Sequence, residues 1–157
     1  MTTPPPSAAR GSGPVDAWES LFRAQVHVMR ELAQDFPIGS VTLSEYDVLF
    51  TLSRYPGRTA RLRDITGQVF LSQPSVSRMV DRLVGRGLVS KGQDPHDGRS
   101  AIVTMTEQGV HEFRAAAVKH SRTISEIMTA ALTPDDMSEL ARITAKLHRN
   151  GPGEPTA

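Results

Sequence analysis

The sequence contains no cysteine, which excludes disulfide bonds, thiolate metal sites and thiol-based redox sensing within this chain. Aromatic residues make up only 5% of it, so leucine, valine, isoleucine and methionine carry the apolar load, a balance that favours helices over an all-β fold. No apolar run approaches the ~20 residues of a transmembrane helix. The opening MTTPPPSAARGSGP lacks the apolar segment of a signal peptide. These absences predict a cytoplasmic protein.

Enzyme motifs are missing as well. The sequence has no glycine-rich phosphate loop, no nucleophile elbow and no HExxH motif, and its carboxylates fall mainly at expected helix caps and turns. We therefore expect no catalytic activity and no cofactor.

The length and composition predict one folded unit. A chain of 157 residues with 38% apolar residues and a mean hydropathy of −0.29 is long enough for a single domain with a core. We expect a disordered leader over residues 1–14, a single unit over 15–150 and a flexible tail over 151–157.

The charge is distributed unevenly although the net charge is only +1. Residues 54–100 contain nine basic and four acidic side chains, so this region carries five net positive charges and the rest of the chain four negative ones. A basic middle between acidic ends indicates a surface that faces DNA, and the alternative is an ordinary solvated charged face. The basic residues are Arg54, Arg58, Arg61, Arg63, Arg78, Arg82, Arg86, Lys91 and Arg99.

Apolar spacing predicts six helices and two strands. Helices are expected over 16–36, 43–54, 61–69, 73–86, 107–132 and 134–149, and strands over 88–91 and 101–105, with a turn over 92–100. The expected buried positions are Trp18, Phe22, Val26, Met29, Leu32, Ala33 and Phe36; Tyr46, Leu49, Phe50 and Leu52; Leu62, Ile65 and Val69; Val76, Val80, Leu83 and Val84; Val110, Phe113, Ala117, Ile124, Ile127 or Met128, and Ala131; Met137, Leu140, Ile143 and Leu147.

Capping residues support these boundaries. Thr42 and Glu45 have the spacing of a capping box, Ser72 and Thr106 stand at expected helix starts, and Thr133 with Asp136 opens the last helix. A glycine at position 87 is expected to end the fourth helix in the left-handed conformation.

A short polar helix followed directly by a hairpin is typical of a winged helix-turn-helix, in which the helix enters the DNA major groove and the hairpin tip lies beside it. The sequence therefore predicts a mainly α fold with a winged helix-turn-helix over about 42–106. The long helices over 15–36 and 107–149 carry more apolar surface than so small a head can cover, so we expect them to form a homodimer. The alternative is a monomeric helical bundle.

The segments QPSVSRMVDRLVGRGLV, DPHDGRS and VTMTEQG, in this order and spacing, resemble the MarR family of bacterial winged-helix repressors. The resemblance extends over about Thr42–Gly109, with Met105 where the family usually has leucine. It implies a triangular dimer, repression of a neighbouring operon, and loss of DNA affinity when a small aromatic or phenolic ligand binds near the junction of head and dimer helices.

Residues of the fourth helix are the expected readers of DNA. Gln73 can form two hydrogen bonds with adenine, and Arg78 can bind guanine or a phosphate. Short side chains on the same helix can approach base edges closely. The predicted recognition residues are Ser72, Gln73, Pro74, Ser75, Ser77, Arg78 and Arg82. At the wing, Arg99 is expected in the minor groove, and by the resemblance Asp97 braces it. Predicted phosphate contacts are Arg54, Arg58, Arg61, Arg63 and Lys91.

The sensor is less visible in the sequence. Candidate ligand-lining residues are Trp18, Phe22, Val26, Met29, Arg30, Tyr46, Phe50 and Phe113, which equally suit plain core packing. A metal-responsive regulator is an alternative, with His27, Glu107 and His111 as candidate ligands, although no HxxxH pair occurs. Further alternatives are a winged-helix module that binds protein, and an activator of the same fold.

Overall fold

The computed structural model describes residues 13–69, 71–95 and 97–149, and the predicted leader and tail lie almost wholly outside them. Two compact units divide between Gln34 and Asp35. None of the described helices has the length and apolar character needed to cross a membrane.

The first unit is the helix α1 (Pro14–Gln34). It begins two residues earlier than predicted and ends before Phe36, which lies in the segment that follows. Trp18, Phe22 and Met29, predicted to be buried, are 60%, 50% and 38% exposed, and Leu32 is its buried residue.

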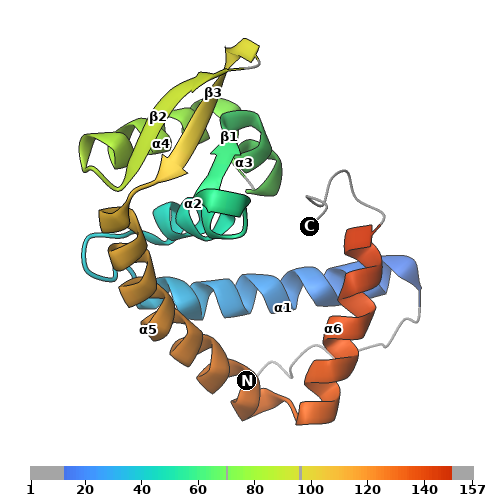
Figure 1. Cartoon of the computed structure of the whole chain (residues 1–157). Coiled ribbons are helices and arrows are strands. Elements are labelled where there is room, and N and C mark those ends of the chain that lie inside the picture. The colour runs from blue at the N-terminus through green and yellow to red at the C-terminus, as the bar shows by residue number, and fades with distance from the viewer. Residues whose placement is uncertain (1–12, 70, 96, 150–157) are drawn as a thin grey trace, which may run out of the picture. The chain divides into compact units, whose positions relative to one another are not determined.

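The second unit contains a winged head, here residues 43–105, and two long helices. Its elements are α2 (Leu43–Ser53), the short 3-10 helix η1 (Pro56–Arg58), β1 (Thr59–Arg61), α3 (Leu62–Gln68), α4 (Gln73–Gly85), β2 (Val89–Asp94), β3 (Asp97–Met105), α5 (Glu107–Ala131) and α6 (Pro134–Arg149). Figure 1 shows the strands of the head and the hairpin that projects from it. The predicted mainly α, winged helix-turn-helix fold is confirmed.

The sheet of the head has one more strand than the sequence predicts. β1 pairs antiparallel with β3, and β3 pairs antiparallel with β2, so the strand order is β1-β3-β2. Three residues are too few to show an alternating pattern, which is why β1 was not predicted. The wing strands are also longer than expected, and most of the turn predicted over 92–100 belongs to β2 and β3.

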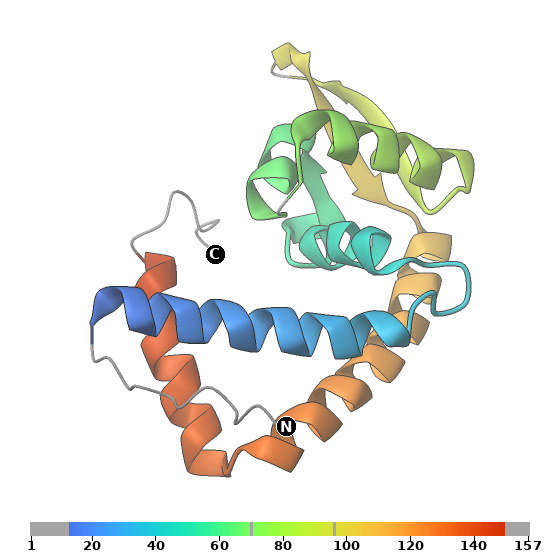
Figure 2. The ribbon, with the colours of Figure 1, turned by 180° about the vertical axis from the view of Figure 1, so that it is seen from behind.

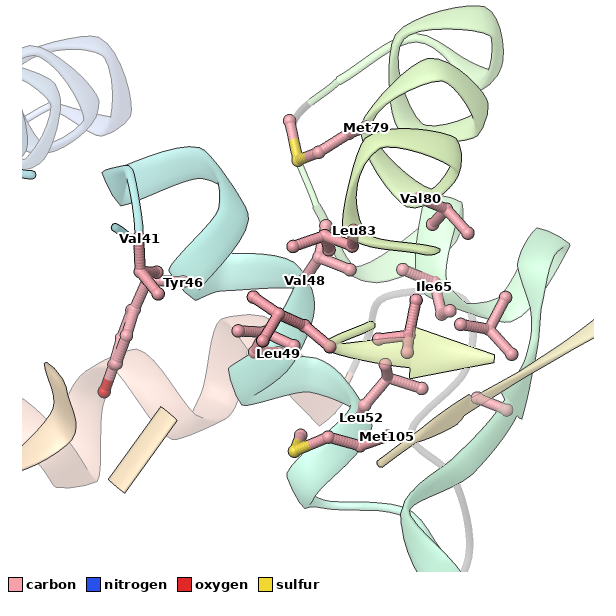
Figure 3. Close-up of a cluster of buried hydrophobic side chains, with 14 of the residues drawn as sticks. Val41, Tyr46, Val48, Leu49, Leu52, Ile65, Met79, Val80, Leu83 and Met105 are labelled. Atoms are coloured by element: carbon pink, nitrogen blue, oxygen red, sulfur yellow. The ribbon is translucent and has the colours of Figure 1, made fainter. Parts of the chain in front are cut away.

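The core of the head lies between α2, α3, α4 and the sheet (Figure 3). Leu49 and Leu52 of α2 meet Ile65 of α3 and Leu83 of α4 in one fully buried cluster. Two of the core residues predicted in the head were wrong: Phe50 is 42% and Val84 is 37% exposed, whereas Val48 and Met79 are buried. The other three predicted core positions of each helix are buried, so the predicted apolar faces were largely correct.

Several predicted caps are confirmed. The N–H of Thr42 donates to Glu45 Oε2 at 3.0 Å and the N–H of Glu45 donates to Thr42 Oγ1 at 3.3 Å, which completes the capping box of α2. The backbone of Gly87 has φ +72°, the left-handed value that glycine adopts at low cost. Thr133 and Asp136 cap α6 reciprocally through hydrogen bonds of 2.9 and 3.2 Å.

The start of α5 is packed tightly against the end of the α4–β2 turn. Thr106 Oγ1 accepts the N–H of Gly109 at 3.0 Å and donates to the carbonyl oxygen of Gly87 at 2.6 Å. A Cβ on Gly109 would lie 1.9 Å from the carbonyl oxygen of Leu88, so no side chain fits at this position. This contact explains the T-x-x-G spacing in the segment VTMTEQG.

Candidate nucleic-acid interface

The predicted recognition residues of α4 lie away from its core-facing side. Val76, Met79, Val80 and Leu83 are buried and fix the helix on the head. Figure 2 shows α4 lying across the sheet with the wing beside it. The remaining positions form a polar face, on which five residues are exposed and two are half-buried: Ser72, Gln73, Pro74, Arg78 and Arg82, and Ser75 and Ser77.

The start of α4 differs from the prediction in one detail. Ser72 stands at the N-cap position, but its side chain accepts no backbone N–H. Its hydroxyl instead lies 2.9 Å from Ser75 Oγ, which accepts a hydrogen bond from Arg78 Nη2 at 3.4 Å. Three polar side chains of the predicted reading face are thus linked by hydrogen bonds. The Ser72 hydroxyl contacts Ser75 and does not cap the helix.

The wing brings its described polar residues together near the tip. Ser100 Oγ donates to Asp97 Oδ2 at 2.6 Å. The side chain of Arg99 lies outside the described part of the structure, so the expected Asp97–Arg99 contact stays a prediction. At the base of the wing, Lys91 Nζ donates to Asp81 Oδ1 at 2.8 Å, which ties β2 to α4.

The basic residues of the middle region divide by their partners. Arg58 lies 3.8 Å from Glu107 and Arg63 lies 3.5 Å from Asp64, both in largely solvated pairs. Arg61 and Lys91 form shorter ion pairs, of 2.5 Å with Asp94 and 2.8 Å with Asp81. Within residues 13–149, as far as they are described, no ion pair engages three of the arginines: Arg54, Arg78 and Arg82. Arg54 instead lies over the ring of Phe50, 5.8 Å from its centroid.

Arg86, counted with the DNA-facing charge, is turned inward. Its Nη1 lies 3.0 Å from both carboxylate oxygens of Glu45, and its Nη2 donates to the carbonyl and hydroxyl oxygens of Ser40 at 2.8 Å. Burial of Glu45 opposes its ionisation, but the Thr42 N–H and the Arg86 guanidinium outweigh that effect and lower the pKa of the carboxyl. Glu45 was predicted as a cap only; the sequence gives no sign that the same carboxylate also holds the end of α4.

The predicted ligand-lining residues fall into two groups. Tyr46, Phe50 and Phe113 come together in the second unit, with the Tyr46 ring centroid 6.2 Å from Phe50 and 5.4 Å from Phe113. The others belong to α1, which is described by itself, and there the rings of Trp18 and Phe22 are 5.9 Å apart: Trp18, Phe22, Val26, Met29 and Arg30. The complete pocket stays a prediction.

His120 of α5 joins this aromatic cluster and was not predicted there. Its ring lies 4.7 Å from Tyr46 and 5.3 Å from Phe36 between centroids. The side chain is buried, and its Nδ1 has no hydrogen-bond partner among the described residues. Burial lowers the pKa of the imidazole, although the Asp35 carboxylate acts in the opposite direction. Its spacing from Phe113 and Ala117 on the α5 stripe was the signal that could have located it.

The candidate metal ligands are not assembled in the described structure. Glu107 and His111 lie one turn apart on α5, where Glu107 neighbours Arg58 and His111 neighbours Glu112. His27 lies on α1. Over the described ranges, no group of three histidine, aspartate or glutamate side chains is placed to hold a metal ion.

A core-anchored polar helix, preceded by a short helix and followed by a projecting hairpin, defines a winged helix-turn-helix module. Residues 40–100 match the model of the MarR family, the family that the motifs of this segment resemble.

Two solved structures share this fold, and one further protein is similar in sequence. A MarR family regulator of Streptomyces coelicolor, solved in complex with DNA, has a TM-score of 0.75 at 20% identity over 94% of both chains. The regulator BpsR of Bordetella bronchiseptica, whose DNA binding is regulated by 6-hydroxynicotinic acid, has a TM-score of 0.71 at 23% identity over 84% of this chain and 98% of its own. An HTH-type transcriptional regulator of Mycobacterium tuberculosis is 28% identical over 106 residues, which cover 68% of this chain and 73% of that protein.

Proposed function

We propose that this protein is a transcriptional regulator that binds double-stranded DNA in a sequence-specific way. The observation that carries the proposal is the polar face of α4, which is held on its buried side by Val76, Val80 and Leu83 and projects next to the wing. Such a helix presents side chains at the depth of the major groove, where base pairs differ in their donors and acceptors. The match of residues 40–100 to the MarR family supports the same function.

Individual roles follow from the chemistry of the exposed face. We assign adenine recognition to Gln73 and guanine or phosphate binding to Arg78, whose position the Ser72–Ser75 contact supports. Pro74, Ser77 and Arg82 complete the reading face, and at the wing we assign minor-groove contact to Arg99, with Asp97 as its brace. The phosphate contacts are assigned to Arg54, Arg58, Arg63 and Lys91.

We further propose that the protein acts as a homodimer. Three apolar side chains of α6 that the sequence predicts to be buried are 40% to 63% exposed in the single chain, and a second copy would cover them: Leu140, Ile143 and Leu147. In this proposal residues 42–106 read DNA, and residues 15–36 and 107–149 dimerise. Two recognition helices related by a two-fold axis fit a palindromic operator with half-sites about 10 base pairs apart.

Repression relieved by a small aromatic ligand is the regulatory behaviour that we propose. The family resemblance supports it, and the cluster of Tyr46, Phe113 and His120 supplies an aromatic surface in the second unit. A thermal-shift screen with phenolic and heteroaromatic acids tests this, because a ligand that binds the folded state raises the melting temperature. A ligand that does so and weakens DNA binding supports the proposal; melting that responds only to chelators would favour the metal-responsive alternative.

The decisive experiment selects DNA from random duplexes and then compares two charge-reversed variants. The double substitution Ser77→Glu and Arg78→Glu places two carboxylates on the reading face and is expected to abolish binding to the selected operator. Its control makes the same pair of changes at Ser121 and Arg122, the same dipeptide on exposed positions of α5, with sedimentation used to check that both variants assemble as wild type does. The control is expected to bind.

Two outcomes would contradict the proposal. Recovery of no enriched sequence, with no salt-sensitive binding to any duplex, would favour a protein-interaction module. Equal binding by the two charge-reversed variants would remove α4 from the interface. Insertion of five base pairs between half-sites, which turns them about half a helical turn apart, should abolish tight binding if the dimer is symmetric.

A further inference from the structure

Asp94 is a buried carboxylate at the outer end of β2, where its neighbours Gln93 and Pro95 are exposed. Its side chain is 2% exposed, and Oδ2 accepts a hydrogen bond from Arg61 Nε at 2.5 Å. Arg61 is itself 35% exposed. A buried carboxylate is costly unless it is paired, so this ion pair, here called the wing latch, is a specific feature of the head and not an incidental surface contact.

The wing latch joins two strands that are not neighbours. Arg61 ends β1 and Asp94 ends β2, and these strands lie on opposite edges of the central strand β3. Arg61 is also the N-cap residue that directly precedes α3. The latch therefore reaches over β3 and ties the outer part of the wing to the first helix of the helix-turn-helix.

A local irregularity brings Asp94 to this position. The strand register shifts between Gln93 and Asp94, so Asp94 pairs with Asp97 while Gln93 pairs with Ala101. Such a bulge re-aims the side chain that follows it. Gln93 is exposed and Asp94 is buried, as expected if the bulge directs the carboxylate inward.

We propose that Arg61 and Asp94 are positioning residues that hold the wing at a fixed angle to α4 and so determine how well the protein discriminates among the base pairs beneath the wing. The inference rests on the proposed DNA-binding function. It changes the role of Arg61, predicted from sequence as a phosphate contact, to that of a residue acting through the wing.

Asp94→Asn tests the inference because a purely electrostatic effect and the loss of the wing latch predict opposite changes in DNA affinity. The substitution removes a negative charge from the basic region, so electrostatics alone predicts equal or tighter DNA binding. Loss of the latch predicts weaker binding to the selected operator, by about tenfold, the size of one mismatched base pair, with lower selectivity at the outer positions. The control Asp64→Asn removes one charge from a solvated pair with Arg63 and is expected to bind no more weakly than wild type.

Variants at Arg61 separate a latch from a phosphate contact. Arg61→Lys keeps the charge but lacks the Nε–H group, so it is expected to lose selectivity at the outer positions while the dependence of affinity on salt stays unchanged. If Arg61 instead bound a phosphate, lysine would keep that contact, and both the salt slope and the outer-position selectivity would stay close to wild type. Combining Arg61→Lys with Asp94→Asn is expected to give little further loss, because both remove the same interaction.

The results distinguish this inference from the function on which it rests. If wild-type protein selects no sequence, the proposed function fails. If wild type selects an operator and Asp94→Asn or Arg61→Lys retains both its affinity and its outer-position selectivity, the latch has no positioning role and the inference is overturned. Should Asp94→Asn fail to fold, as judged by thermal melting, Arg61→Lys alone decides between these outcomes.

Discussion

The winged head and the last helix of the chain use their apolar residues in opposite ways. In the head, Leu49, Ile65 and Leu83 are fully buried within one chain. In α6, no described side chain is buried, and Leu147 is 63% exposed. A stripe of helical spacing therefore has two meanings: in the head it packs a core, whereas in α6 it leaves a surface that a second molecule can cover.

The largest effect is expected in the head core. Leu83→Ala removes a fully buried side chain between α4 and the rest of the head and should lower the free energy of unfolding by about 2–5 kcal/mol. Urea denaturation followed by circular dichroism measures the change. The neighbouring Val84→Ala is the control, since Val84 is 37% exposed and should cost under about 1 kcal/mol. Equal losses at the two positions would contradict the assigned core.

A smaller effect, on the self-association of the protein, is expected from a change in α6. Ile143→Glu places a carboxylate in the exposed apolar stripe and should weaken self-association by about tenfold or more, because the charge would be desolvated in a dimer. Sedimentation equilibrium over a range of concentrations measures it. Lys146→Glu, on an exposed position of the same helix, reverses a charge outside the stripe and serves as control. A wild-type chain that is monomeric throughout would remove the basis of the comparison.

The smallest expected effect concerns His120, in the second unit but outside the head. Because burial lowers its pKa in the folded protein, the unfolded state binds a proton more readily, and the free energy of unfolding should fall as the pH drops below 6.5. His120→Phe keeps a ring between Phe36 and Tyr46 and should flatten that part of the profile. Chemical denaturation at several pH values measures it, with His111→Gln as an exposed control. A wild-type profile that rises on acidification would show the opposite sign.

Most features that depend on neighbouring residues in the chain could be predicted from the sequence, although the expected side-chain cap at Ser72 is not formed. The capping pair Thr42–Glu45, the left-handed Gly87 and the Thr106 cap each rest on local geometry, and all are present. The order of helices and the two wing strands follow from apolar spacing in the same way. The polar face of α4 was also located correctly, because four buried residues fix its opposite side.

Features that depend on contacts between distant segments could not be predicted. β1 exists only because Thr59–Arg61 finds a partner in β3, and Asp94 turns inward only because the register shifts beside it. The sequence counts Arg86 with the basic surface, but its guanidinium is paired with Glu45, forty-one positions away in the chain. Composition counts charges but does not say which of them are already paired.

The packing of Gly109 against Leu88 leaves no slack at the beginning of α5. The first turn of α5 contacts the backbone of Leu88 directly, so no flexible side chain lies between them that could adjust if α5 moved. We therefore expect a tilt of α5 to displace the turn that separates α4 from β2, and with it both elements of the proposed DNA interface.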